Sequence, residues 1–136
     1  MMDNIKALYE VKAKRLAYQR WTLKVEVIRA KLEYPAGSMG GEKSGSPTNV
    51  NTIEYTQAEY VDTVRAMDKA KEAWKMAEAR ALTVIAKLTD PVQTTVLQMR
   101  FIDFMPFDKI ATAIGYSERQ VIRINLKAIK KIKRCH

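Results

Sequence analysis

The chain has 136 residues, of which 24 are Lys or Arg, 15 are Asp or Glu, one is His and one is Cys, and its formal net charge is +9. This charge predicts a polyanionic partner, and the single cysteine excludes a disulfide within the chain, which is typical of a reducing compartment. We find no apolar run of the kind that forms a signal peptide or spans a membrane, so we expect a cytoplasmic protein with no membrane contact.

A long helix is predicted over residues 3–34, because this stretch lacks Gly and Pro and Pro35 disfavours helical geometry at the residue before it. Apolar residues recur along it at three- and four-residue spacing and form one stripe: Tyr18, Trp21, Val25, Ile28 and Leu32. Leu16, Leu23 and Val27 are expected to broaden this stripe. A single helix cannot bury such a stripe, so the helix requires a partner.

Residues 35–56 are predicted to be a flexible linker, because four of the five glycines occur there. Within this segment, Gly40–Ser44 lacks the spacing of a phosphate-binding loop. Thr56 and Glu59 then have the spacing of a capping box, with Tyr55 and Tyr60 as a hydrophobic staple. A second long helix is therefore predicted over residues 57–88.

The two long helices have similar lengths and are predicted to pair as an antiparallel hairpin. Their apolar seams exceed what two helices can cover, so residues 1–88 are predicted to form the region through which the chain assembles into a homodimer or a higher homo-oligomer. The predicted interface residues are Tyr18, Trp21, Val25, Ile28, Leu32, Val64, Met67 and Trp74.

Residues 89–136 are predicted to form a helix-turn-helix domain. Asp90 before Pro91 predicts a helix over 90–103, and Pro106 separates it from a helix over 107–114. Gly115 suits a left-handed helix end, and Ser117 and Gln120 have the spacing of a capping box before a helix over 117–134. A helix, a glycine turn and a capped helix in this order are typical of DNA-binding motifs. The expected fold is all-α: a long hairpin followed by this three-helix domain.

The last helix carries its basic residues on one side. Arg119, Arg123, Lys127, Lys130 and Arg134 fall within an arc of about 80° when each residue is rotated by roughly 100°. The helix dipole favours cations at a helix C-terminus but disfavours Arg119 and Arg123 near the N-terminus. Charge also concentrates at the two ends of the sequence: residues 1–36 carry net +4, 37–88 net zero and 89–136 net +5. The pattern favours contact with DNA over a merely solvated face.

Roles are assigned along this helix by position. Its N-terminal turns normally enter the major groove, so the residues predicted to read bases are Glu118, Arg119, Gln120 and Arg123. The residues predicted to contact phosphates are Ser117, Lys109, Lys127, Lys130, Lys131 and Arg134. Ile122, Leu126 and Ile129 form a second apolar stripe, which contact with the hairpin or another subunit would bury.

No catalytic or metal-binding constellation is found in the sequence. The only histidine, His136, adjoins the only cysteine, Cys135, and two such ligands do not make a zinc site. Because His136 is the only histidine, a serine or cysteine nucleophile activated by histidine is not expected. We therefore predict that the protein is not an enzyme and has no cofactor.

Four segments resemble region four of bacterial sigma factors: Leu97–Phe101, Phe107–Ala111, Ile114–Ser117 and Val121–Lys131. Nothing in the chain resembles the sigma region that melts promoters. A small basic protein with a helical N-terminal half and this C-terminal end is similar to the ArpU/RinA group of phage-encoded transcriptional regulators. The resemblance implies a DNA-binding regulator of phage or prophage late genes, most simply an activator.

Two alternatives remain open. Small phage DNA-packaging subunits and scaffold proteins also join a DNA-binding motif to a helical hairpin, and a closed ring indifferent to promoters would indicate that class. The second alternative is a protein that contacts host RNA polymerase directly, in the manner of sigma region four.

Overall fold

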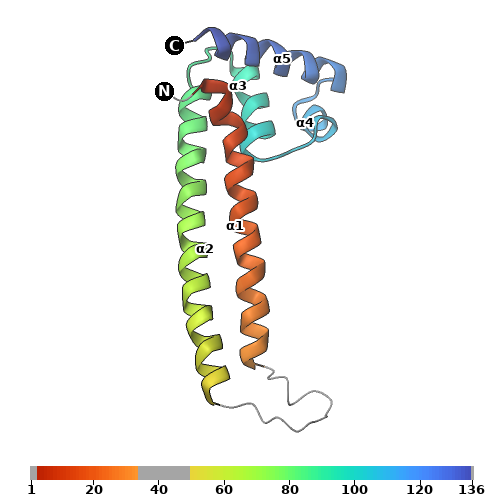
Figure 1. Cartoon of the computed structure of the whole chain (residues 1–136). Helices are drawn as coiled ribbons and strands as arrows, with labels where there is room; N and C mark the ends of the chain where they lie inside the picture. The colour runs from red at the N-terminus through yellow and green to blue at the C-terminus, as the bar shows by residue number, and fades with distance from the viewer. Residues whose placement is uncertain (1–2, 34–49, 136) are drawn as a thin grey trace. The chain divides into compact units, whose positions relative to one another are not determined.

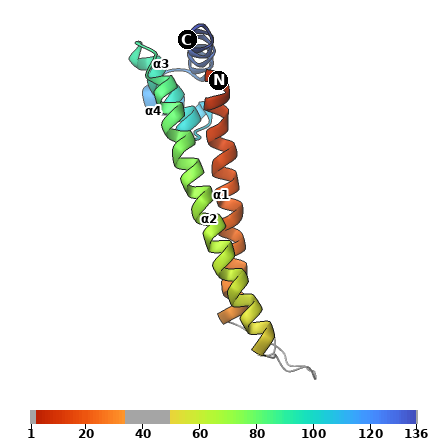
Figure 2. The same cartoon turned by 60° about the vertical axis from the view of Figure 1, so that its left-hand side comes forward.

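The computed structural model describes residues 3–33 and 50–135, and all regular structure within these ranges is helical (Figure 1). The all-α prediction is confirmed. Helices α1 (Asn4–Glu33) and α2 (Val50–Ile85) form a long antiparallel hairpin, and the two run side by side in both views (Figures 1 and 2). The helices that follow are α3 (Pro91–Leu97), η2 (Gln98–Ile102), α4 (Phe107–Ile114) and α5 (Glu118–Arg134). No helix in the described residues is both long and apolar enough to cross a bilayer.

Helix α2 differs from the prediction at both ends. It begins at Val50, so the predicted linker is wrong for residues 50–56, and residues 35–49 lie outside the described residues. Thr56 lies inside the helix, although an N-cap residue must have a non-helical backbone, so the predicted capping box is wrong. The helix ends at Ile85 instead of Leu88, and Leu88 N–H donates to Ile85 O (3.0 Å) in the turn that follows.

The predicted start at Asp90 is confirmed. The Asp90 carboxylate accepts from the backbone N–H of Val92 (2.8 Å) and of Gln93 (3.4 Å), and Pro91 occupies the first helical position. The predicted helix over 90–103 consists of two elements, the α-helix α3 and the π-helix η2 that directly follows it. At the end of η2, Asp103 N–H donates to Gln98 O (3.0 Å). Such wider turns are rare and cannot be read from apolar spacing.

The chain divides into two compact units. The first unit contains Met1–Arg15 and Ala73–His136, and the second contains Leu16–Glu72. The sequence placed a domain boundary between residues 88 and 89. The helix-turn-helix residues lie in the same compact unit as the N-terminal end of α1 and the C-terminal end of α2.

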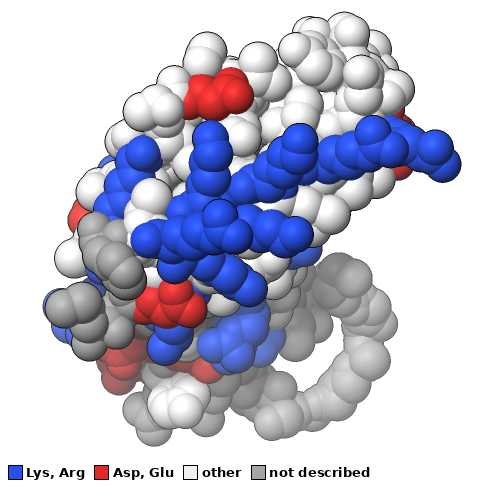
Figure 3. Space-filling view, turned by 90° about the horizontal axis from the view of Figure 1, so that it is seen from above, with Lys and Arg blue, Asp and Glu red and all other residues white. Residues whose placement is uncertain are grey.

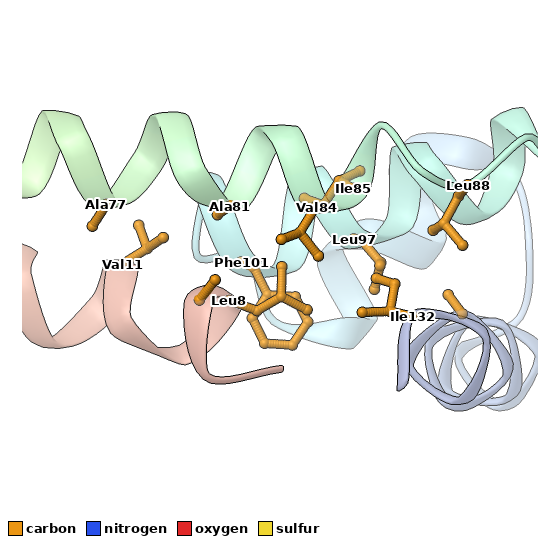
Figure 4. Close-up of a cluster of buried hydrophobic side chains, with 12 residues drawn as sticks. Leu8, Val11, Ala77, Ala81, Val84, Ile85, Leu88, Leu97, Phe101 and Ile132 are labelled. Carbon is orange, nitrogen blue, oxygen red and sulfur yellow. The ribbon is translucent and has the colours of Figure 1, made fainter. Parts of the chain in front are cut away.

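The first unit has two buried apolar clusters. The larger joins residues from five segments (Figure 4): Ala7, Leu8 and Val11; Ala77, Ala81, Val84, Ile85 and Leu88; Leu97; Phe101; and Ala128 and Ile132. The smaller consists of Val96, Ile110, Ala111 and Val121. Both α3 and α5 contribute to both clusters, so the position of α5 depends on α1 and α2 as well as on α4.

The second unit has buried residues in both of its helical segments. Val25, Ile28 and Thr63 are buried, and the Thr63 hydroxyl donates to Glu59 O (2.7 Å). Arg29 donates to the Tyr60 hydroxyl (3.4 Å), and this hydrogen bond raises the pKa of Arg29 above its ordinary value.

Three residues expected to broaden the apolar stripe of α1 lie elsewhere. Leu16, Leu23 and Val27 are 54%, 65% and 56% exposed, whereas Val25 and Ile28 in the same helix are buried. The expectation of one broad stripe is therefore wrong. The helix has two apolar faces: a buried one with Val25 and Ile28, and an exposed one with Leu16, Leu23 and Val27.

Candidate nucleic-acid interface

The turn between α4 and α5 has the geometry that the sequence predicts. Gly115 has φ +76°, a left-handed conformation, and its N–H donates to Ala111 O (2.9 Å). A Cβ placed on Gly115 would meet no atom within 4 Å, so it is the backbone conformation and not crowding that selects glycine.

The capping box at the start of α5 is also confirmed. The Ser117 hydroxyl accepts from Gln120 N–H (3.2 Å), and the Gln120 side-chain oxygen accepts from Ser117 N–H (2.9 Å). These bonds occupy atoms of two predicted DNA contacts. A two-bond contact between Gln120 and adenine uses the same amide oxygen, so that contact would share this oxygen with the capping bond or compete with it.

Replacing Ser117 by Ala is expected to lower the free energy of unfolding by about 1 kcal/mol, because the Gln120 N–H loses its partner. Urea unfolding at constant pH measures this change. Thr112→Ala is the matched control, since the exposed Thr112 hydroxyl only donates back to Asp108 O within α4. Equal stability of the Ser117 variant and the unchanged protein would contradict the role of the cap.

Helix α5 has one buried and one exposed face. On the buried face Val121, Ala128 and Ile132 are fully buried and Asn125 is 7% exposed. The exposed face carries seven cations: Arg119, Arg123, Lys127, Lys130, Lys131, Lys133 and Arg134. Figure 3 shows Lys and Arg side chains gathered in a band on this face. The basic face is thus held outward by apolar packing behind it.

The residues predicted to contact DNA are placed as follows. Glu118, Arg119, Gln120 and Arg123 are exposed in the first two turns of α5. Lys127, Lys130, Lys131 and Arg134 are exposed further along it. Lys109 is exposed in the first turn of α4, and Ser117 is exposed at the cap. The structure brings these side chains onto one motif, and their individual roles stay predictions.

Two residues far from α5 in sequence lie at its C-terminal end. The Asn4 side chain donates to Cys135 O (3.1 Å) and to Ile132 O (3.4 Å), and the Lys87 ammonium donates to the Asn4 side-chain oxygen (3.4 Å). Through Asn4, Lys87 therefore adds a cation near the C-terminal end of α5, where carbonyl groups attract positive charge. No sequence signal points to Asn4 or Lys87, because neither belongs to a motif.

The segment between η2 and α4 is held by an arginine and a strained phenylalanine. The Arg100 guanidinium lies over the Phe107 ring (4.2 Å) and donates to Met105 O (3.1 Å). Phe104 has φ 58°, a conformation usually taken by glycine, and the Arg15 guanidinium lies over its ring (4.5 Å). Packing of the Phe104 ring against the larger cluster offsets the backbone strain.

The second apolar stripe of α5 is covered only in part. Ile129 packs against the larger cluster, whereas Ile122 and Leu126 are 37% and 54% exposed. Of these three residues, only Ile129 is partly buried by the rest of the chain. Ile122 and Leu126 border the basic face, where an apolar side chain can contact the methyl group of thymine.

Three of the eight residues predicted for the oligomer interface pack within the chain. Val25 and Ile28 are buried in the hairpin, and Trp74 packs against the larger cluster. Tyr18, Trp21, Leu32, Val64 and Met67 are half-buried, and the cations of Arg20 and Lys24 lie over the Trp21 ring at 5.3 Å and 4.9 Å. Their role in assembly stays a prediction.

The described residues contain no group of three or more His, Cys, Asp or Glu side chains that could hold a metal ion. Comparison with protein-family models, with curated protein sequences and with solved structures finds no match to this chain.

Proposed function

We propose that this chain is a sequence-specific regulator of transcription that binds double-stranded DNA, with α5 in the major groove. The observation that carries the proposal is the division of α5 into a buried, mostly apolar face and an exposed face with seven cations. An ordered helix of this kind meets the two requirements for groove recognition, which are phosphate attraction and a rigid reading surface.

The position of each cation supports a division of roles along α5. Arg119 and Arg123 lie one turn apart near the capped N-terminus, and an arginine can donate two hydrogen bonds to the edge of a guanine. Lys127, Lys130 and Lys131 lie further along, where a helix leaves the bases and passes the backbone. Ammonium groups suit phosphate there because they act as point charges.

The resemblance to the ArpU/RinA group and to sigma region four supports a more particular proposal, an activator of phage or prophage late genes. Direct contact with RNA polymerase belongs to the same proposal. A packaging or scaffold subunit is the alternative. A footprint confined to one promoter supports the regulator, and promoter-independent binding by a closed ring supports the alternative.

Replacing Arg123 by Ala is expected to weaken binding to the preferred site by about 1–3 kcal/mol and to weaken binding to random DNA less, because base contacts carry the sequence preference. Replacing Lys131 by Ala is expected to weaken both kinds of DNA alike and to reduce the salt slope by about one unit. Selection from random DNA identifies the site, and titration over a salt series then measures both variants.

The matched control is Lys71→Ala, which removes an exposed cation from the second unit and should leave both affinities unchanged. An equal loss on preferred and random DNA for Arg123→Ala would show that this residue does not read bases. Unchanged affinity in both α5 variants would show that the basic face serves another partner.

A further inference from the structure

The outer face of α1 in the second unit carries an exposed heptad seam. The seam consists of residues 16, 20, 23, 27 and 30, which are separated alternately by four and by three positions. This is the spacing of the two contact positions, a and d, in a coiled coil. All five are exposed, and the three largest apolar members, Leu16, Leu23 and Val27, are more than half exposed. Helix α2 does not cover them, because it packs on the buried side of α1 that contains Val25 and Ile28.

The two flanks of this seam carry opposite charge. Helical geometry places Lys24 and Lys31 along one side of it and Glu26 and Glu33 along the other. All four residues are exposed. In the heptad, Lys24 and Lys31 occupy position e, and Glu26 and Glu33 occupy position g. Charges at these two positions select the partner helix and its direction.

A groove borders the basic flank. It has a volume of about 370 Å³ and is lined by Leu23, Val27 and Ile28 together with the cations of Arg20, Lys24 and Lys31, and by Glu59 and Thr63 from α2. An apolar floor with a cationic rim fits a helix that has apolar residues on one face and carboxylates beside them. The acidic flank of α1 itself has this chemistry.

We propose that α1 of a second copy of the chain packs along this seam in parallel orientation, as a two-stranded coiled coil over residues 16–33. In parallel orientation the acidic flank of each helix meets the basic flank of the other, and Glu26 of one copy lies opposite Lys31 of the second copy, twice by symmetry. In antiparallel orientation each flank would meet its like. Arg20 is the one charged residue in the seam, and a single polar residue there fixes register at a cost in stability.

This interface is distinct from the one that the apolar stripe of α1 predicts. Tyr18, Val25 and Leu32 lie on the opposite side of the helix from Leu16 and Leu23, by helical geometry. Two copies would supply two α5 helices, which suits paired half-sites in DNA. Dimer formation is measured in the absence of DNA. The proposed dimer and the proposed DNA binding are therefore tested independently, and either can be disproved without the other.

Sedimentation equilibrium of the full chain without DNA, at tens of micromolar, is expected to show a dimer (a concentration chosen to detect micromolar association). Leu23→Glu places a charge in the seam and is expected to raise the dissociation constant roughly a hundredfold or more. The matched control is Val61→Glu, at a residue 48% exposed on α2, which should leave the dimer unchanged. Circular dichroism verifies that both variants keep their helix content.

Charge reversal tests the orientation. Glu26→Lys alone and Lys31→Glu alone are each expected to weaken the dimer roughly tenfold, because each creates two like-charge pairs. The two changes in one chain are expected to restore it, because the pairs are remade with exchanged signs. An independent test is oxidation of the Leu16→Cys chain that also carries Cys135→Ser, which should yield a covalent dimer. A residue at the end of the seam meets itself in parallel packing, whereas in antiparallel packing along the whole seam it would face residue 30 of the other copy.

A monomeric full chain, or a dimer that survives Leu23→Glu, would overturn the proposed interface. Failure of the double charge reversal to restore the dimer, or absence of the covalent dimer, would overturn the parallel orientation.

Discussion

Replacing Leu8 by Ala is expected to lower the free energy of unfolding by about 2–5 kcal/mol, the range for a fully buried leucine. Leu8 is 1% exposed and packs in the larger cluster with Phe101 and Ile132. The truncation leaves a cavity beneath the helix proposed to bind DNA, although Leu8 lies far from that helix in sequence. Urea unfolding monitored by circular dichroism measures the loss.

Leu82→Ala is the matched control for this prediction. Leu82 belongs to the same compact unit but is 38% exposed, so its truncation should change stability by less than about 1 kcal/mol. Similar losses for the two leucines would contradict the assignment of Leu8 to the core.

A chain reduced to residues 89–136 is expected to show no cooperative thermal transition. Leu97, Phe101, Ala128 and Ile132 would lose the residues of α1 and α2 that cover them. Only the smaller cluster of Val96, Ile110, Ala111 and Val121 would remain, which is too small a core to offset the entropy of ordering the chain.

The comparison protein for this prediction is the first unit on its own, with residue 15 joined to residue 73 by a short Gly/Ser segment. It keeps both clusters and is expected to unfold cooperatively. Circular dichroism on heating distinguishes the two proteins. A cooperative transition in the 89–136 chain would show that the helix-turn-helix residues form an independent domain.

Sequence signals located the elements where local chemistry decides the backbone. Asp90 before Pro91, the left-handed Gly115 and the capping box of Ser117 with Gln120 each involve residues within four positions of one another. Such features depend little on the rest of the fold, so the α4–turn–α5 motif could be predicted closely.

Local patterns failed where the same residues permit two outcomes. A threonine followed three residues later by glutamate starts a helix only if the backbone before it is not helical, and Thr56 lies inside α2. Phe104 takes the left-handed conformation that glycine normally signals, because contacts of its ring offset the strain. Neither outcome depends on nearby residues alone.

Periodicity also cannot tell which of two apolar faces a partner helix will cover. Val25 and Leu23 both repeat at helical spacing in α1, but Val25 is buried and Leu23 is exposed. The contribution of Asn4 and Lys87 to the end of α5 was likewise beyond prediction, because it joins residues more than 80 positions apart.

The hydrogen bond from Asn4 to Cys135 joins residues separated by 131 positions, and this separation has a consequence for synthesis in the cell. The ribosome makes α1 long before α5, so Leu8 and Val11 lack part of their cover until Ala128 and Ile132 have been added. The larger cluster therefore closes only after translation has passed Ile132, and contacts so distant in sequence form slowly. During that interval the apolar residues at the start of α1 stay partly exposed to water.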